Sequence, residues 1–511
     1  MKSILGRPER TDRLGRFARG EAGGSIPIAL TFLTLMLMMG GLAVDLMRFE
    51  ATRTRLQNTS DRAVLAAASL RQKLEPREVV EDYFRKADLF EKLVNINPTH
   101  TINAKTVEVD AAADVPPYFI QMLGIDEMEA PANSIATERI TDVEISLVLD
   151  ISGSMGSYSR IENLRAAATE FVDTVMSGSS PGRTTISIVP YTGHVNLGAA
   201  LAAKYNIPLK HTKSYCVDLP ATAFNSFGVS RTTAMNQAGH FDPYTGSGTR
   251  EASRYFCPVG PGDTITTISD NTEALKLAVA GLTDNDNTSI DIGMKWGAAL
   301  LEKSAQGVVS GTHSNRPFDP TTREVLKIIV LMTDGENTTE YVLNSTYAGT
   351  NLSNIWRRAS DGKLSAYYNR SNTSNDYYSP DTGSWTAAPF TSMTGVTNLT
   401  WQDVWRYASV GYVAKKLYAD PKGESESTWL SNFRTTVSAS TKNTRLNNIC
   451  TATKNAGVIV YGIGLEAPTA GATVIKKCVT SAGHYFDVKG LEIATAFRVI
   501  ASQINHLRLT Q

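Results

Sequence analysis

Five oxygen-bearing side chains, carried by three separate segments, are candidate ligands for one metal ion. Asp150, Ser152 and Ser154 form a D-x-S-x-S pattern, Thr288 lies in NTSIDIG, and Asp334 lies in MTDGE. Carboxylates and hydroxyls are hard ligands that suit Mg²⁺, or Mn²⁺ and Ca²⁺, and they suit zinc or copper poorly. Because few of these ligands carry a charge, the ion would keep positive charge and one open position for an acidic group of a partner.

The segments around these residues predict a parallel sheet that positions the site. The apolar run VEISLVLD ends in Asp150, and the apolar run VLKIIVLM leads to Asp334. Runs of this kind are typical of strands buried on both faces. Between them, Ile161, Leu164 and Phe171 recur at helical spacing. Strands that alternate with helices indicate a doubly wound α/β sheet, whose binding residues meet at the carboxyl ends of the strands.

Two of the three candidate segments have a second interpretation. A D-x-S-x-S pattern by itself could be an ordinary helix N-cap. Thr288, which we expect to open a helix, is preceded by DNDN, and Thr283 and Thr272 are alternative ligands. Both alternatives fit the position between a strand and a helix less well, so Thr288 is the predicted ligand.

Two long segments, about residues 198–270 and 338–444, interrupt the alternation of strands and helices. The second is rich in Ser, Thr, Asn and Tyr and contains five of the six tryptophans of the chain. Low-complexity disorder lacks such aromatic density. We therefore expect folded or partly folded insertions at one rim of the sheet, and the alternative is a pair of mobile loops.

The four cysteines predict two local disulfides. Cys216 and Cys257 lie in one polar segment, and Cys450 and Cys478 flank one C-terminal strand. None of them forms a CxxC or a Cys/His zinc pattern. Outside the cytoplasm, pairing within each segment is the natural expectation, whereas four unpaired thiols are the alternative.

The N-terminal part predicts one membrane-spanning helix. Residues 26–44 are apolar and uncharged, which is the length that a bilayer core requires. Six basic residues precede them and place residues 1–25 in the cytoplasm: Lys2, Arg7, Arg10, Arg13, Arg16 and Arg19. We predict a span over residues 26–46, with everything from Met47 onward in the periplasm or envelope. A cleaved signal peptide is the alternative.

The rest of the chain divides into three parts. Residues 47–72 contain no Gly or Pro, so we expect the helix to continue through 47–75. Residues 76–140 predict a small segment of helix and short strands, and residues 141–507 form the α/β domain. Basic and acidic residues number 50 each among 511, which argues against a nucleic-acid binder. Only one run is long enough to cross a bilayer, which excludes a multi-span membrane protein.

The three candidate metal-binding segments together resemble the metal-ion-dependent adhesion site of von Willebrand factor A domains, which have a Rossmann-like α/β fold. The resemblance rests on DISGSM, on the threonine of NTSIDIG and on MTDGE. It implies direct coordination by Ser152, Ser154 and Thr288. It also implies that Asp150 and Asp334 contribute directly or through water.

The N-terminal region resembles that of the TadE/TadG family of the tight-adherence (Flp) pilus assembly system. The matching features are a short Gly-containing entry, the apolar span, the VD at its exit and the pattern LQN-x-x-D-x-A-x-LAAA. Members that a prepilin peptidase processes carry a Glu shortly after the cleaved glycine. Here Gly24 is followed by Ser-Ile-Pro-Ile-Ala, so we expect retention as an anchored protein with a pilin-like helix.

Two classes of function follow from these patterns. The first is a noncatalytic, membrane-anchored component of a Tad/Flp-type pilus assembly or secretion apparatus, which binds an acidic residue of a pilus or envelope protein through the metal. The alternative is a Mg-dependent hydrolase or phosphotransferase with Asp150 as nucleophile. The aspartate that many phosphotransferases carry two residues on is Ser152 here, and Walker A, HExxH and GxSxG motifs are absent. His194 and His484 are isolated, and we predict structural roles for both.

Overall fold

The computed structural model describes residues 25–510 except 70–71, 73, 101–103, 140–141, 178, 180–181, 286, 321–324 and 372, and it leaves out the side chains of 100, 104, 139 and 506–510. The chain divides into two compact units, Met1–Ile140 and Thr141–Gln511. The predicted cytoplasmic segment, residues 1–25, lies outside the described residues except for Ser25.

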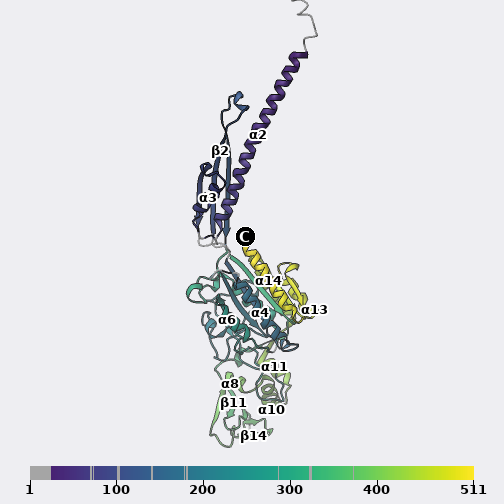
Figure 1. Ribbon diagram of the computed structural model, residues 1–511. Helices are drawn as coiled ribbons and strands as arrows, with labels where there is room; N and C mark the ends of the chain where they lie inside the picture. Colours follow the sequence, from purple (N-terminus) through teal and green to yellow (C-terminus); the bar gives the residue numbers. More distant parts are fainter. Residues whose placement is uncertain are drawn as a thin grey trace, which may run out of the picture. The chain divides into compact units, whose positions relative to one another are not determined.

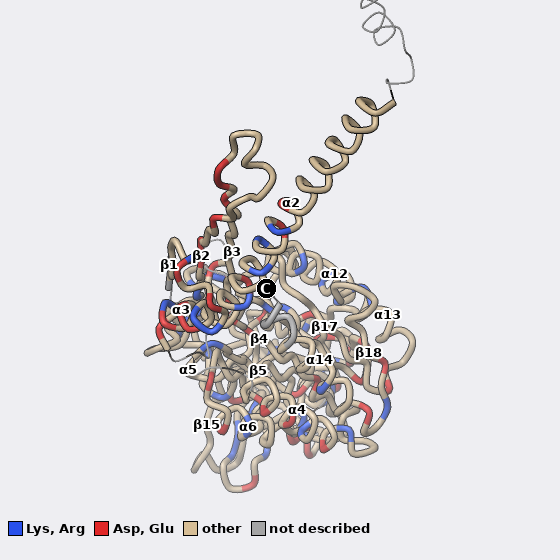
Figure 2. The backbone as a smooth tube through the Cα atoms, turned by 45° about the horizontal axis from the view of Figure 1, so that its top comes forward, with Lys and Arg blue, Asp and Glu red and all other residues tan. Residues whose placement is uncertain are grey.

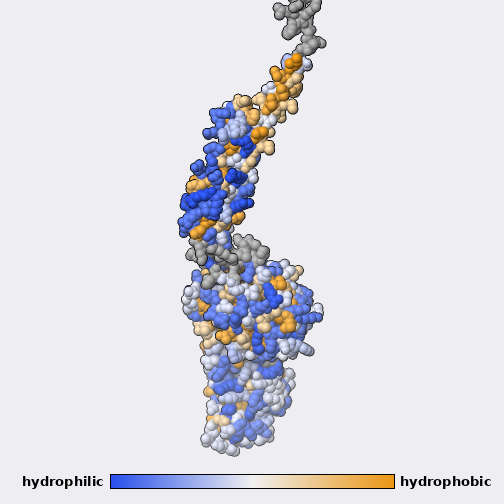
Figure 3. Space-filling model, in the orientation of Figure 1, coloured by the Kyte–Doolittle hydropathy of each residue, from blue (hydrophilic) through white to orange (hydrophobic). Residues whose placement is uncertain are grey.

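The first unit contains one long helix, α2 (Ser25–Ala68), which is unbroken over 44 residues (Figure 1). Among the described residues, it is the one helix that is long and apolar enough to cross a membrane. Its first half exposes apolar side chains and carries no charge before Asp45 (Figures 2 and 3). The helix ends at Ala68, so the expectation that it extends to residue 75 is wrong. Pro76 begins the next helix, α3 (Pro76–Lys86).

The second half of α2 packs on an antiparallel sheet of three strands, in the order β1-β2-β3. The strands are β1 (Leu93–His100), β2 (Ala104–Val115) and β3 (Met128–Arg139). Val107, Val109 and Ala111 alternate with more exposed residues along β2 and are buried. Leu56 and Ala63 of α2 belong to the same core. The period of two therefore gives this sheet one face toward the helices.

The second unit is built on a sheet of six strands in the order β18-β17-β9-β4-β5-β8. All neighbouring pairs are parallel except β5 and β8, which are antiparallel. The predicted α/β class with a mostly parallel sheet is confirmed. The strands are β4 (Asp142–Asp150), β5 (Thr184–Tyr191), β8 (Thr266–Ser269), β9 (Val325–Thr333), β17 (Ile459–Leu465) and β18 (Tyr485–Val488).

Helices cover both faces of this sheet and form two separate cores. The first core contains residues of α4 (Arg160–Ser177), α6 (Thr272–Ala280) and α14 (Glu492–Thr510). The second contains residues of α7 (Ile290–Ala299), α12 (Ala439–Asn455) and α13 (Thr469–Cys478). Along β4, Leu147 and Leu149 face the first core and Val148 faces the second.

Two glycines bring α7 unusually close to the sheet. A Cβ on Gly297 would lie 2.4 Å from Val148 Cγ2, and one on Gly293 would lie 2.6 Å from the ring of Tyr191. Real Cβ atoms essentially never approach other atoms so closely. The spacing of these glycines therefore lets the helix lie directly against β4 and β5.

The first insertion is held by loops, short elements and a disulfide. Its elements are α5 (Gly198–Ala202), β6 (Val217–Asp218) and β7 (Asn236–Gln237), and β6 pairs with β7. Residues 266–269, which we expected in the insertion, form β8 of the main sheet. The sequence TTIS lacks the apolar run that marks the central strands, because an edge strand is only half covered.

The second insertion is folded around an aromatic core. Its largest sheet has five strands in the order β14-β13-β12-β11-β15, and a two-stranded ladder joins β10 to β16. Trp401, Trp405, Tyr418 and Phe433 are buried together. The strands are β10 (Glu340–Leu343), β11 (Leu352–Arg358), β12 (Leu364–Tyr367), β13 (Tyr377–Ser379), β14 (Ser384–Thr386), β15 (Val396–Thr400) and β16 (Arg434–Val437). The helices include α8 (Trp401–Tyr407) and α11 (Glu426–Phe433).

The end of the second insertion differs from the predicted residue 444. Helix α12 begins at Ala439, and the Ser438 side chain caps it by accepting a hydrogen bond from the Thr441 amide. The first turns of α12 are polar, so the apolar spacing in the sequence appears only further along the helix. The boundary was therefore placed too late.

Both predicted disulfides are present. Cys216 pairs with Cys257 inside the first insertion, and Cys450 of α12 pairs with Cys478 at the end of α13. All four cysteines are buried. The second bridge joins two helices on the same face of the main sheet.

Candidate metal centre

The candidate metal ligands lie at the carboxyl ends of two adjacent parallel strands. Asp150 is the last residue of β4, and Asp334 directly follows β9. The two strands are paired in register, with Leu149 beside Met332. The loop after β4 makes a short 3₁₀ turn at Gly153–Gly156. The register of the sheet thus brings together residues that are 184 positions apart in the chain (334 − 150).

Hydrogen bonds connect four of the five candidates, through one backbone amide and two hydroxyls. Asp150 Oδ1 accepts a bond from the Ser152 amide at 2.8 Å. The hydroxyls of Ser152 and Ser154 are 3.1 Å apart, and the Ser154 hydroxyl donates to Asp334 Oδ1 at 2.7 Å. Adjacent ligands of an octahedral Mg²⁺ with bonds of about 2.1 Å lie about 3 Å apart. The spacing of these oxygens therefore fits a shared Mg²⁺-like ion.

Thr288 is placed beside the turn that carries Asp334. It was expected to open the helix, but it lies two residues before the start of α7, next to the N-cap Ser289, and it is buried. Its Oγ1 is 3.8 Å from the position that a Cβ on Gly335 would take. The Thr288 amide donates to the Thr338 hydroxyl at 3.0 Å. Thr288 therefore joins the edge occupied by the other candidates, although its hydrogen bonds run to the Thr338 segment.

The two carboxyl groups are in an environment that favours a bound cation. Burial raises the pKa of Asp150, and the nearby charge of Asp334 raises it further. Hydrogen bonds from Thr333 and Ser152 oppose this rise. Burial also raises the pKa of Asp334, against the effect of Ser154 and Arg160. Two neighbouring carboxylates with little access to water repel each other, and a divalent cation would relieve that repulsion.

Arg160 belongs to the site, and the sequence did not reveal it. Its Nη1 donates to Asp334 Oδ2 at 3.0 Å and to the Ser154 carbonyl at 3.3 Å. Its Nη2 donates to Glu466 Oε2 at 2.8 Å. In the sequence, Arg160 is one charged residue at the start of an amphipathic helix. Glu466, which follows β17, is 306 residues away, so no local pattern indicates their pairing.

Lys442 of α12 is a second missed residue, and it fixes the loop of Thr288. Its side chain is buried, and its Nζ donates to the carbonyls of Thr288 at 2.9 Å and Thr338 at 3.0 Å. It also bonds to the Ser289 hydroxyl. Burial lowers the pKa of Lys442, while Asp291 and other acids oppose that change. We had assigned this residue to an insertion, where a lysine is normally solvated.

The Asp284 carboxylate lies close to the loop after β4 that carries Ser152 and Ser154. A Cβ on Gly156 would lie 2.4 Å from Asp284 Oδ2. The neighbouring Asn285 amide donates to the Ile151 carbonyl at 2.8 Å. Asp284 and Asn285 therefore pack against the loop after β4, a contact that the sequence did not indicate.

The chemical type of the candidate ligands decides which metal ions the site can bind. Within the part of the chain that the structure describes, no cluster of three or more His, Cys, Asp or Glu side chains could hold a metal ion. The candidate centre depends instead on two carboxylates and three hydroxyls. Such oxygen ligands suit Mg²⁺ with water in the remaining positions and suit zinc poorly.

The two isolated histidines have local partners. His194 is buried, and its Nδ1 accepts from the Val195 amide at 2.9 Å. His484 Nδ1 is 2.7 Å from the Ser481 hydroxyl, and its ring packs near Tyr461. These contacts agree with structural roles for both residues.

One family model matches the N-terminal part of the chain. Residues 23–70 match the family model described as putative Flp pilus-assembly TadE/G-like. No curated protein matches the chain.

Similar solved structures include bacterial pilus proteins. The vWF domain of the type V pili tip protein Mfa5 from Porphyromonas gingivalis is 14% identical, with a TM-score of 0.33, over 73% of this chain and 97% of that one. The adhesive tip pilin GBS104 from Group B Streptococcus agalactiae is 12% identical, with a TM-score of 0.30, over 71% and 99%. The pilus adhesin SpaC from Lactobacillus rhamnosus GG is 13% identical, with a TM-score of 0.30, over 81% and 34%.

These overall likenesses are low, so the assignment of the fold rests on the sheet itself. Its six strands are parallel except for one antiparallel edge strand, and helices cover both faces. The chain therefore carries a TadE/G-like segment at residues 23–70 and, from β4 onward, a doubly wound α/β domain with a mostly parallel sheet.

Proposed function

We propose that the chain is a noncatalytic, membrane-anchored component of a Tad/Flp-type pilus or secretion apparatus that binds a protein partner through a divalent metal ion. The observation that carries the proposal is the cluster of Asp150, Ser152, Ser154 and Asp334, which hydrogen bonds connect at the carboxyl ends of two adjacent strands. The TadE/G-like match at residues 23–70 supports the pilus context. Mg²⁺ is the proposed ion, with Mn²⁺ or Ca²⁺ as substitutes.

In this proposal the ion binds Ser152, Ser154 and Thr288 directly, and the two aspartates bind directly or through water. The bonds that Asp150 accepts from the Ser152 amide and the Thr333 hydroxyl hold its carboxylate in place. Of the two carboxylates that face the ion, Asp334 is also paired with the Arg160 guanidinium, so its charge is shared between two cations. The neutral hydroxyls leave a position that an acidic side chain of the partner fills.

The rim of the loop offers the partner access to this position. Ser154 and residues 156–159 are exposed, although Ser152 and Asp150 beneath them are buried. Tyr158 is 83% exposed and lies near the Arg160 guanidinium. An exposed aromatic ring beside an ion is a common anchor in protein interfaces. The proposed partner therefore contacts the 153–159 loop and places one carboxylate on the metal.

The proposed topology has residues 1–25 in the cytoplasm, a span over residues 26–46 and the remaining chain in the periplasm or envelope. The long apolar stretch of α2 before Asp45, which carries no charge, supports the span. The basic residues before it support the orientation. The two disulfides support a location outside the cytoplasm, where disulfides persist.

A Mg-dependent hydrolase remains the second candidate, because Arg160 supplies a basic group beside the two aspartates. In the structure this guanidinium is engaged by Asp334 and Glu466, which leaves it poorly placed to grip a phosphate. Incubation of the full chain in detergent with Mg²⁺ and phosphate esters separates the two functions. Turnover that Asp150→Asn abolishes would favour the enzyme.

Partner capture tests the adhesion-type function. The full chain, purified in detergent, is mixed with the other pilus components in Mg²⁺ or in chelator, and Asp150→Asn is compared with Asp487→Asn, an exposed aspartate of β18. We expect capture by the wild type and by Asp487→Asn in Mg²⁺, and its loss in chelator and in Asp150→Asn. If metal binding is lost while capture persists, the site is real and the proposed use of it is wrong.

A further inference from the structure

The loop that joins β2 to β3 carries an exposed apolar surface. Residues 116–125, named here the hairpin tip, include five large apolar side chains that are mostly exposed: Tyr118, Phe119, Met122, Leu123 and Ile125. Met122 is 81% exposed. A loop of a protein surrounded by water is normally polar, so this concentration of apolar side chains indicates an apolar environment.

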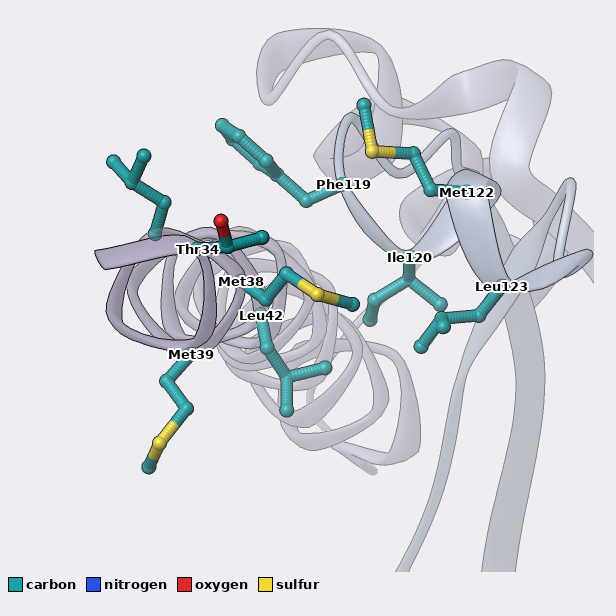
Figure 4. A pocket seen from close by; sticks show the side chains of 9 residues that line it. Thr34, Met38, Met39, Leu42, Phe119, Ile120, Met122 and Leu123 are labelled. Atoms are coloured by element: carbon teal, nitrogen blue, oxygen red, sulfur yellow. The ribbon is translucent and has the colours of Figure 1, made fainter. Parts of the chain in front are cut away.

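The hairpin tip lies beside the apolar half of α2, within the first unit. Phe119, Ile120 and Leu123 face Met38 and Leu42 across a groove of about 330 Å³ (Figure 4). The groove extends along the helix as far as Thr34.

The helix backbone approaches the tip closely at one point. A Cβ on Gly41 would lie 2.4 Å from the Phe119 ring. Gly41 thus provides the space that lets this ring lie directly against α2.

Lipid offers no hydrogen-bond partner to a backbone amide, and several amides of the tip have partners within the protein. The Asp45 carboxylate is fully buried and accepts bonds from the amides of Tyr118, Phe119 and Ile120 at 2.6–2.9 Å. Pro116 and Pro117, which precede them, have no N–H.

A short 3₁₀ turn of the tip, Ile120–Leu123, brings partners to two more donors. The Met122 amide bonds to the Phe119 carbonyl at 3.1 Å, and the Gly124 amide bonds to the Gln121 carbonyl at 3.0 Å. An unpaired amide costs several kcal/mol in hydrocarbon but little in water. These five amides of the tip therefore need no water to satisfy them.

The position of the groove along α2 sets the depth of the tip. The groove contacts α2 at residues 34–42, and the proposed span ends at residue 46. At 1.5 Å per residue, these contacts lie about 6–18 Å inside the exit of the span. The hydrocarbon core is about 30 Å thick. If α2 crosses the bilayer, the side of the helix at this depth is covered by the tip and the tip is surrounded by acyl chains.

The residues at the exit of the span fit the membrane interface. Arg48 donates to the Pro116 carbonyl at 3.1 Å, and its guanidinium lies 4.0 Å from the centre of the Tyr118 ring. Arginine and tyrosine are typical of the level where headgroups meet acyl chains. Asp126 and Glu127 follow the tip directly and limit how deeply it enters.

We propose that the hairpin tip inserts into the lipid leaflet on the side where α2 leaves the membrane, as a second membrane anchor beside the span. The partner of this surface is the acyl region of the bilayer. Two adjoining attachments would fix the rotation of α2 and keep the three-stranded sheet at the membrane surface. This inference rests on the proposed span of α2 and concerns a surface remote in sequence from the metal site.

Depth-dependent quenching in vesicles tests the insertion. A single cysteine is placed at Met122, at Leu35 in the span, or at Val94, an exposed residue of β1, and it carries an environment-sensitive fluorophore. The native cysteines are paired in disulfides, so the added thiol is the one that reacts. The full chain is reconstituted in phosphatidylcholine–phosphatidylglycerol vesicles with nitroxide-labelled acyl chains.

We expect quenching on the order of twofold or more at Met122 and Leu35, because both labels lie within the same hydrocarbon core of about 30 Å, and none at Val94. Quenching at Leu35 without quenching at Met122 would overturn the insertion and leave the span intact. Absence of quenching at both would overturn the span and the insertion together. Efficient disulfide cross-linking of unlabelled Met122→Cys between chains would assign the tip to a second copy instead of lipid.

Discussion

Replacement of Asp150 by Asn removes one charge from the proposed metal centre while it keeps the shape of the side chain. Asn keeps one oxygen for the bond from the Ser152 amide to Oδ1, and its amide nitrogen can donate to the Thr333 hydroxyl, which in the wild type donates to Oδ2. The fold should therefore persist, and the change in metal affinity should report the charge. Ser152→Ala is the matched perturbation, since it removes a neutral ligand from the same loop.

The two substitutions should lower the metal affinity by clearly different amounts. A unit charge about 4 Å from a divalent ion, the separation of a water-mediated ligand, contributes about 2 kcal/mol in water and about 8 kcal/mol at an effective dielectric constant of 20. Even the lower value corresponds to a loss of affinity of about 30-fold in Asp150→Asn. Water replaces a lost hydroxyl, so Ser152→Ala should cost only about 1 kcal/mol, or about fivefold.

Calorimetric titration of the full chain with Mg²⁺ or Mn²⁺, in detergent at constant pH, measures both losses. Circular dichroism checks that each variant is folded. Asp487→Asn controls for loss of an aspartate outside the site and should bind metal as the wild type does. If Asp150→Asn binds metal with wild-type affinity, or if Ser152→Ala is the more damaging change, the assigned ligand set is wrong.

Three further expectations concern packing, cross-linking and topology. Gly297→Ala should lower the free energy of unfolding by about 1–3 kcal/mol, because its methyl would overlap Val148, whereas Gly246→Ala has no neighbouring atom within 4 Å and should be near neutral in thermal melts. Replacing both cysteines of the α12–α13 disulfide by serine should cost about 3.6 kcal/mol in denaturant unfolding, since the bridge spans 28 positions, and an unchanged midpoint would show that the bridge does not constrain the unfolded chain. Reporter domains that need export should be active when fused after Gln72, and activity of cytoplasmic reporters there would contradict the orientation.

The sequence alone was sufficient for features whose physical cause is local. The apolar run before Asp45 is long enough to predict a membrane span, and helix α2 continues through it without a break. Strands buried on both faces, such as β4 and β9, appear as continuous apolar runs that end in aspartate. Because parallel strands align their carboxyl ends, these runs also predicted that the segments of Asp150 and Asp334 would meet.

The sequence was less informative where burial is partial or the pattern is polar. The edge strand β8 has no apolar run, and α12 begins with a polar turn, so both insertion boundaries were misplaced. The aromatic residues of the second insertion indicated a folded core, but not its five-stranded sheet. Antiparallel pairing between short segments depends on register, which these segments do not encode locally.

The tertiary structure alone decided which distant groups surround the site. Arg160 meets Asp334 and Glu466, and Lys442 meets the carbonyls of Thr288 and Thr338, across separations of 104–306 residues. A charged side chain in a helix is normally solvated, so its sequence context could not indicate burial. The same holds for the hairpin tip: its apolar residues were visible in the sequence, but their place beside α2 depends on how the sheet packs against that helix.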